Sequence, residues 1–181
     1  LPTSHGSRAT SRNPKTVTSA FAEQYQRLGF TVLGKSTLPE FGLTATTEPL
    51  ATGPTRNPWN PDHSSGGSSG GSASLVAAGV VPIAHANDGG GAVRVPAACC
   101  GLVGLKPSRG RLISAPELER MPVAIAVQGV VTRTVRDTAA FYREIERLHP
   151  TLAPIGNVVG PGRQRLRIAV VDEGMAGLPV D

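Results

Sequence analysis

The sequence predicts an α/β fold, in which helices alternate with short buried strands over a chain of 181 residues. The first observation is an apolar face with helical spacing between residues 17 and 28. The second is a set of short apolar runs of strand length, at residues 30–33, 80–86, 102–105 and 166–171. The third is the presence of 22 glycines and 16 prolines, which supply the turns between so many short elements.

The first predicted helix begins at Asn13, a good N-cap, with Pro14 at the first helical position. Gly29 ends this helix, because glycine readily adopts the left-handed conformation that closes a helix. The apolar face of the helix consists of Val17, Ala20, Phe21, Tyr25 and Leu28.

Two glycine-rich turns lie on either side of one helix–strand unit. Residues 64–74 contain only serine and glycine apart from one alanine, and they lead into a short helix at 75–78. After the strand at 80–86, residues 88–91 form the second turn, and a further helix begins near residue 93. On composition alone the first segment resembles a flexible linker, but a linker does not explain the second glycine cluster. The two turns predict a site built from backbone amides, with serine hydroxyls beside it.

The last predicted helix begins at a capping box. Thr134 and Asp137 have the required spacing, and the helix that follows runs to about Leu148.

The composition excludes several classes of protein. The net charge is +5, but the arginines are scattered and only 4% of the residues are aromatic, so no stacking surface for nucleic acid is predicted. No apolar stretch approaches the roughly 20 residues of a membrane-spanning helix. Residues 1–5 have neither the charged nor the apolar region of a signal peptide. We expect a protein that binds neither nucleic acid nor a membrane.

The cysteines and histidines indicate a reducing compartment and no metal. Cys99 and Cys100 are adjacent and are the only cysteines, so a disulfide is unfavourable and we expect the cytoplasm. The four histidines have none of the spacings of metal ligands. His63 lies beside Asp62 and Ser64, but a surface histidine is the simpler interpretation. We expect no metal and no cofactor.

Residues 29–36, GFTVLGKS, fit the pattern of a phosphate-binding P-loop, and Asp172 and Glu173 follow an apolar run as a magnesium-binding acid does. The context is wrong for a nucleotide site. A phosphate cradle needs a strand before its first glycine, whereas here the strand-like residues lie between the two glycines. Pro39 also interrupts the helix that should follow. We therefore reject an ATPase.

The stretch from Gly66 to Arg111 reads GGSSGGSASLVAAGVVPIAHANDGGGAVRVPAACCGLVGLKPSRGR. It closely resembles the amidase signature family, whose pattern is GGSSGGSA, a helix, D-x-GGS-x-R-x-P-A and CG-x-x-GLKP-[ST]-x-GR. Flanking segments, among them TRNPWN at 55–60 and GVVTRTVRD at 129–137, extend the resemblance to about residues 3–148. General bacterial amidases and nylon-oligomer cyclic dimer hydrolases resemble it most.

The resemblance implies a single amidase signature domain with a mixed central sheet and helices on both faces, of which residues 1–181 are the central part. It implies hydrolysis of a linear or cyclic carboxamide at its C–N bond, by a serine nucleophile, a bridging serine at a cis peptide bond and a lysine base. A base is needed because an unactivated serine hydroxyl is a poor nucleophile. The bridging position falls on Ser68.

The same resemblance assigns the other site residues. The oxyanion hole would consist of backbone amides, because glycine lets several N–H groups converge on one point. These are the amides of Gly89, Gly90, Gly91 and residue 92. The residues implied to support the two turns are Ser69, Asp88 and Arg94.

This sequence departs from the family pattern at two points. The nucleophilic serine of the pattern is replaced by Ala92, which has no hydroxyl with which to attack. The lysine base lies upstream of the segment that begins at Thr3, so we expect that it is not in this chain. The chain is therefore expected to be an internal fragment of an amidase, inactive as given.

Two functions remain open. The first is an amidase that lacks its nucleophile and keeps the backbone of its oxyanion turn. The second is a natural pseudoenzyme or a subunit of an amidotransferase-like complex, which Ala92 itself favours. The expected partners are a small-molecule amide and the rest of the amidase polypeptide, and a homo-oligomer remains open.

Overall fold

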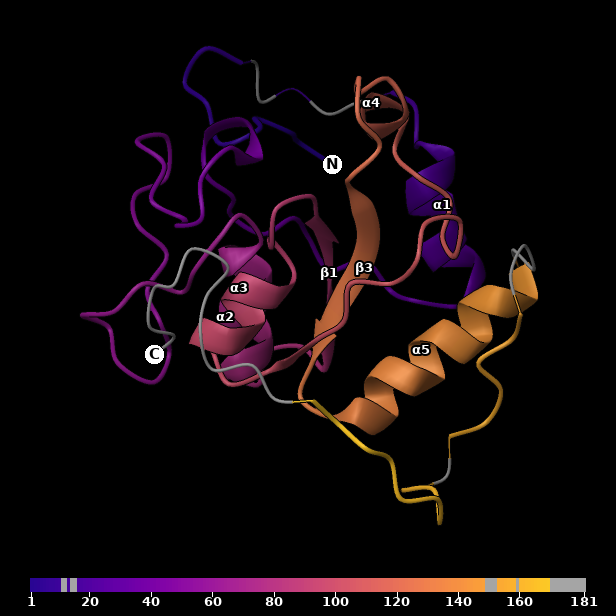
Figure 1. The fold of residues 1–181 in the computed structure, drawn as a ribbon. Helices are drawn as coiled ribbons and strands as arrows, with labels where there is room; N and C mark the ends of the chain where they lie inside the picture. The colour runs from indigo at the N-terminus through magenta and orange to yellow at the C-terminus, as the bar shows by residue number, and fades with distance from the viewer. Residues whose placement is uncertain (11–12, 14–15, 149–152, 159, 170–181) are drawn as a thin grey trace.

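Helices lie on both sides of a small β-sheet in the computed structural model of the chain (Figure 1). The residues that it describes are 1–10, 13, 16–148, 153–158 and 160–169. Its helices are α1 (Ala20–Arg27), the 3₁₀ helix η1 (Glu40–Gly42), α2 (Gly70–Ala77), α3 (Arg94–Cys99), α4 (Pro116–Glu119) and α5 (Val135–Leu148). Its strands are β1 (Ile83–Asp88), β2 (Val103–Gly104) and β3 (Val127–Thr132). The predicted α/β class is confirmed.

The sheet has the strand order β1-β3-β2, and both strand pairs are antiparallel. The central strand is β3, and all six of its residues are buried. The register places Asp88, the last residue of β1, opposite Val127. Within the described residues the sheet thus contains only antiparallel pairs, where the family resemblance implies a mixed sheet for the whole domain.

The two faces of β3 contact different helices, because side chains alternate from one face of a strand to the other. On one face Val131 packs with Val76 of α2. On the other face Val130 packs with Phe141 and Ile145 of α5. Each of these buried side chains contributes about 1.5–3 kcal/mol relative to an exposed position. The helices therefore hold the sheet from both sides, as predicted.

The first helix begins later than predicted. It starts at Ala20 instead of near Asn13, and Pro14 lies outside the described residues. Residues 16–18 are Thr-Val-Thr, whose branched side chains lose rotamer freedom in a helix. Val17 is 79% exposed and so does not belong to the buried face.

Two predicted strands are wrong. Residues 30–33 and 166–169 form no strand, and residues 170–171 of the second run lie outside the described residues. Leu33 and Leu166 are largely exposed. An apolar run becomes a strand only where a neighbouring strand pairs with its backbone, and these runs have no such neighbour in the described part of the chain.

The remaining elements differ from the predictions mainly in their bounds. β1 begins at Ile83 and continues to Asp88, and β2 is only two residues long. The helix after the serine-rich segment already begins at Gly70. The helix predicted near residue 93 is α3.

The capping box of α5 is present. The hydroxyl of Thr134 accepts a hydrogen bond from the backbone N–H of Asp137 at 3.1 Å and donates one to its carboxylate at 2.8 Å. α5 ends at Leu148, as predicted. Among the helices that the structure describes, none is long and apolar enough to cross a membrane.

Candidate functional site

The buried carboxylate of Asp88 organises the glycine turn that follows β1. Its Oδ1 accepts a hydrogen bond from the backbone N–H of Gly91 at 2.8 Å. Its Oδ2 accepts hydrogen bonds from the N–H groups of Val93 at 3.3 Å and Arg94 at 3.4 Å. The turn is thus folded around one carboxyl group.

The guanidinium of Arg94 binds the same carboxylate with two hydrogen bonds. Nε donates to Oδ2 of Asp88 at 2.8 Å and Nη2 donates to Oδ1 at 2.9 Å. Burial alone raises the pKa of Asp88, but the hydrogen bonds from Arg94 and from the amides of Val93 and Arg94 outweigh this effect and hold the pKa well below its usual range. Asp88 is therefore ionised at neutral pH, beside the turn that it was expected to support.

A second cation, Lys106, reaches the same turn. Its ammonium group donates to the carbonyl of Gly89 at 2.7 Å and to that of Ile125 at 2.9 Å, and it lies 3.3 Å from Oδ1 of Asp88. Lys106 was not among the residues expected at the site. Its position in the GLKP segment, shortly after the short strand β2, was the available signal.

Three amides at the turn have no hydrogen-bond partner within the described part of the chain: those of Gly89, Gly90 and Ala92. The fourth amide that was expected to contribute, that of Gly91, is bonded to Asp88. Gly91 also has a φ of +135°, which side-chain-bearing residues rarely adopt. Backbone N–H groups that converge without partners can bind a negatively charged oxygen.

Ser68 lies in the turn before α2, and the peptide bond between Gly67 and Ser68 is cis. The fully buried Thr47 holds this turn, because its hydroxyl donates to the carbonyl of Gly66 at 2.8 Å and accepts from the N–H of Gly70 at 3.2 Å. Ser68 lies between these two bonded positions. Sequence reasoning missed Thr47, since nothing local marks it.

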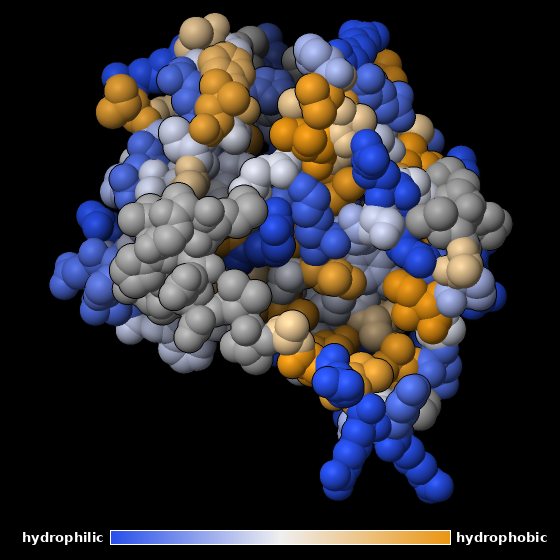
Figure 2. Space-filling model, in the orientation of Figure 1, coloured by the Kyte–Doolittle hydropathy of each residue, from blue (hydrophilic) through white to orange (hydrophobic). Residues whose placement is uncertain are grey.

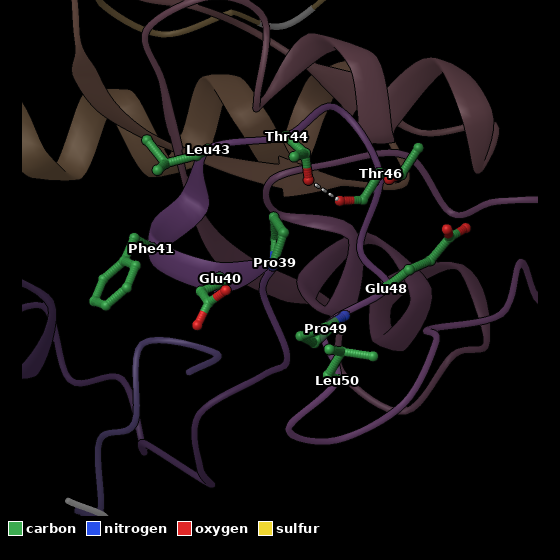
Figure 3. A pocket seen from close by; sticks show the side chains of 9 residues that line it. All are labelled: Pro39, Glu40, Phe41, Leu43, Thr44, Thr46, Glu48, Pro49 and Leu50. Atoms are coloured by element: carbon green, nitrogen blue, oxygen red, sulfur yellow. Dashed lines mark hydrogen bonds between the residues drawn. The ribbon is translucent and has the colours of Figure 1, made fainter. Parts of the chain in front are cut away.

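A hollow of about 560 Å³ is lined by residues between 39 and 50, a segment that approaches Ser68 at Gly42. Phe41 and Leu43 are at one end of it, and they flank Gly42, where an added Cβ atom would be 3.6 Å from the Ser68 Oγ atom. Glu48 is at the other end (Figure 3). The full lining is Pro39, Glu40, Phe41, Leu43, Thr44, Thr46, Glu48, Pro49 and Leu50.

The serine turn and the glycine turn are in contact through α3. An added Cβ atom on Gly66 would be 2.9 Å from Cα of Pro96 in α3, the helix that follows Ala92. A second connection is the hydroxyl of Ser72 in α2, which donates to the carbonyl of His85 in β1 at 2.7 Å. The elements that flank the two predicted turns therefore pack against each other.

Ala92 is half-buried at the entry to α3. Ser69 occupies the N-cap position of α2, and its carbonyl accepts a hydrogen bond from the N–H of Ala73 at 3.0 Å. Its hydroxyl makes no capping hydrogen bond. Ser69 thus joins the serine turn to α2 through its backbone.

Apolar surface borders the glycine turn. The Cδ1 atom of Ile125 would lie 3.9 Å from a Cβ atom on Gly89, and Ile125 and the nearby Val123 are both exposed. On the face shown in Figure 2, apolar patches alternate with hydrophilic side chains. Apolar groups can therefore be bound next to the unpaired amides.

The described residues form neither the P-loop, nor the histidine–serine pair, nor the metal site considered from the sequence. Gly29 closes α1 with a φ of +83°, and no strand precedes it within the described residues, so residues 29–36 are not a P-loop. Residues 172–173 lie outside the described residues. The hydroxyl of Ser64 accepts from the N–H of Gly66 and is not bonded to His63. Across the described ranges, no three His, Cys, Asp or Glu side chains are grouped as a metal site.

Comparison with known proteins gives consistent matches. The family model described as Amidase matches residues 1–174. AmiC of Mycobacterium leprae is 61% identical over 153 residues, which cover 83% of this chain and 33% of that protein. The 6-aminohexanoate-cyclic-dimer hydrolase of Paenarthrobacter ureafaciens is 50% identical over 122 residues, which cover 66% of this chain and 25% of that protein.

A solved structure shows the same fold. It is a subunit of the glutamyl-tRNA(Gln) amidotransferase of Thermotoga maritima, which has a TM-score of 0.71 and 42% identity over 78% of this chain and 31% of that one. This chain spans about a third of the length of the AmiC proteins that it matches.

Proposed function

Because this chain belongs to the amidase family, we propose that the polypeptide that carries it hydrolyses carboxamide C–N bonds, and that the serine turn around Ser68 and the glycine turn at residues 89–92 supply part of the active site. The substrate class proposed is a small linear or cyclic amide, and the reaction uses no metal or other cofactor.

The observation that carries this proposal is the glycine turn. Amide hydrolysis passes through a tetrahedral intermediate whose former carbonyl oxygen is negatively charged, and fixed N–H donors stabilise that charge. The unpaired amides of Gly89, Gly90 and Ala92 are such donors. The hydrogen bonds to Asp88 fix the turn from Gly91 onward before substrate arrives, so little reorganisation of that part is needed during the reaction.

In the proposed reaction a serine at position 92 attacks the carbonyl carbon of the amide through its Oγ atom. The proton of that serine passes to Ser68, which delivers its own proton to a lysine elsewhere in the full polypeptide. When the C–N bond breaks, Ser68 gives a proton to the leaving amine and takes one back from the lysine, and water then hydrolyses the acyl-enzyme to the acid and the free serine. The close approach of Gly66 to Pro96 of α3, the helix that follows position 92, supports this relay.

Ala92 has no hydroxyl, so this chain cannot form the acyl-enzyme in the proposed reaction. The backbone amide at position 92 is retained whichever of the two residues is present. We therefore propose that the full-length polypeptide with Ala92 binds amides without hydrolysing them.

The test is Ala92→Ser in the full-length polypeptide, with release of ammonia or amine measured on a panel of linear and cyclic amides. Turnover by the Ala92→Ser variant and none by the alanine form is expected. Ala98→Ser is the matched control, because it adds the same hydroxyl to an exposed position of α3 outside the turn. If the Ala92→Ser variant releases no ammonia or amine from any amide of the panel, the proposed hydrolysis is contradicted.

Ala92 also supports a second candidate, a pseudoenzyme or a subunit that binds an amide within a larger complex. One neighbour in structure is by its name a subunit of an amidotransferase. This candidate predicts that the source gene encodes alanine at position 92 and that Ala92→Ser stays inactive while amides still bind. A serine codon would exclude a natural pseudoenzyme.

We further propose a reducing compartment, the cytoplasm, because both cysteines are free thiols. Fractionation of cells that express the full-length protein tests this.

A further inference from the structure

We propose that Lys106 is a positioning residue for the oxyanion hole, which fixes the Gly89–Gly90 peptide so that the N–H of Gly90 points toward the substrate. This inference rests on the proposed amide hydrolysis. It assigns to Lys106 a role that acts through the backbone and not through contact with the substrate.

The ammonium group of Lys106 is held by three acceptors from three segments. These are the carbonyl of Gly89 in the turn, the carbonyl of Ile125 before β3, and the carboxylate of Asp88 at the end of β1. An ammonium group has three N–H donors, so each acceptor can be matched by one. Only about a quarter of the Lys106 side chain is exposed. Its nitrogen atom is therefore fixed in place.

The direction of the Gly89 carbonyl determines the direction of the next N–H group. The carbonyl of Gly89 and the N–H of Gly90 belong to one planar trans peptide unit and point to opposite sides of it. Because Lys106 binds the carbonyl at 2.7 Å, the N–H of Gly90 points away from Lys106. On Gly90 an added Cβ atom would have no neighbour within 4 Å, so the space around this residue is open to a ligand.

Glycine on both sides makes an external restraint necessary. Residues without a Cβ atom rotate about φ and ψ with little steric cost, so the peptide between Gly89 and Gly90 can take several orientations. The hydrogen bonds of Asp88 fix Gly91 and Val93, but none of them reaches the Gly89–Gly90 peptide. Lys106 supplies that missing contact.

Neutralisation of the Asp88 charge alone does not explain the position of Lys106. Arg94 already binds both oxygens of Asp88, so the carboxylate has a cation without Lys106. A positive charge on the Gly89 carbonyl also polarises the peptide and makes the Gly90 N–H a stronger donor. The stabilisation by this stronger donor increases as negative charge develops on the substrate oxygen.

The experiment compares Lys106→Met with Lys106→Arg in the full-length polypeptide that also carries Ala92→Ser. Lys106→Met is expected to lower kcat by about 10- to 100-fold with KM changed by less than about threefold, because an oxyanion donor acts mainly in the transition state. Lys106→Arg is expected to recover part of kcat, since a guanidinium can donate to the same carbonyls.

Arg109→Met is the matched control. Arg109 donates to the carbonyl of Ala124 at 3.1 Å, so it tethers the segment before β3 without touching the glycine turn. Its removal is expected to leave kcat unchanged. An equal loss of kcat in Arg109→Met and Lys106→Met would overturn the proposal, because tethering of that segment would then explain both.

A crystal structure of the full-length Ala92 protein with Lys106→Met gives a readout that does not depend on turnover. The Gly89 carbonyl is expected to turn away from its position or to occupy several orientations. An unchanged orientation would overturn the proposal. If the Ala92→Ser reference protein hydrolyses no amide, the proposed function fails, and this orientation alone decides whether Lys106 positions the peptide.

Discussion

Asp88 and Arg94 form an ion pair in which the carboxylate is fully buried and the guanidinium side chain is 53% exposed. The pair joins the last residue of β1 to the first residue of α3, across the glycine turn. Because Arg94 contacts water while Asp88 does not, the carboxylate has lost most of its hydration and depends on its protein partners. The shape of the turn is thus tied to the charge of one group.

Stability is therefore expected to fall at acid pH through Asp88. Its pKa in the folded protein lies below the value of about 3.9 in an unfolded chain. The stabilisation is fully present above that unfolded value and is lost as the pH falls through the folded pKa. We expect Asp88→Asn to lower the free energy of unfolding by about 2–4 kcal/mol at pH 7.

Urea unfolding of the full-length protein and of Asp88→Asn between pH 7 and pH 3 checks this. The two free energies of unfolding should approach each other as the pH falls below about 4, because Asp88 of the unfolded chain then begins to bind a proton whereas an asparagine at this position cannot. A constant difference across this range would show that the charge of Asp88 does not stabilise the turn.

Local sequence signals predicted the elements that are fixed by neighbouring residues. The capping residues Thr134 and Asp137 placed the start of α5, and the glycine cluster placed the turn after β1. β3 was not predicted, because Gln128 and Gly129 interrupt its apolar run. Its burial comes from pairing with β1 and β2 and from helices on both faces, which are contacts between distant parts of the chain.

The same distinction applies to the candidate site. The two turns follow from their glycines and serines, but Thr47 and Lys106 contact them from 19 and 17 residues away along the chain. Both residues donate to backbone carbonyls. Every residue has a backbone carbonyl, so the sequence does not indicate which one accepts such a hydrogen bond. Such supporting contacts become visible only in the folded structure.

The two adjacent cysteines are expected to react very differently. Cys99 is exposed and Cys100 is buried, and burial raises the pKa of Cys100 to about 11. Only a thiolate reacts readily with an alkylating reagent, so Cys100 is protected by both its pKa and its burial. Mass spectrometry after treatment of the full-length protein with iodoacetamide at a mildly alkaline pH should find Cys99 modified and Cys100 unmodified.

Unfolding in guanidinium chloride before treatment should expose both thiols. Cys99→Ser is the control, and it should show no modification of this segment in the folded state. Alkylation of Cys100 in the folded Cys99→Ser protein would contradict the buried position of its thiol.

Gly71 is expected to tolerate no side chain. A Cβ atom there would overlap the backbone carbonyl oxygen of Thr37, closer than Cβ atoms approach such an atom in folded proteins. Gly71→Ala should lower the free energy of unfolding by about 1–3 kcal/mol, because the backbone of one segment must move. Gly34→Ala is the control, since nothing lies within 4 Å of its added Cβ atom. Equal unfolding midpoints in urea for the two variants would contradict the close packing of α2 on residue 37.

The hydroxyl of Thr47 is expected to matter more than its methyl group. Thr47→Val keeps the shape of the side chain but leaves the carbonyl of Gly66 and the N–H of Gly70 buried without their partner, at a cost of about 1–3 kcal/mol. Thr47→Ser keeps both hydrogen bonds and loses one methyl group, at a cost of about 1 kcal/mol. Urea unfolding of the full-length protein gives both values, and hydrogen exchange of the Gly70 amide should be faster only in Thr47→Val. If the serine variant is as unstable as the valine variant and the Gly70 amide is equally protected in both, packing of the methyl group and not the hydroxyl holds the turn around Ser68.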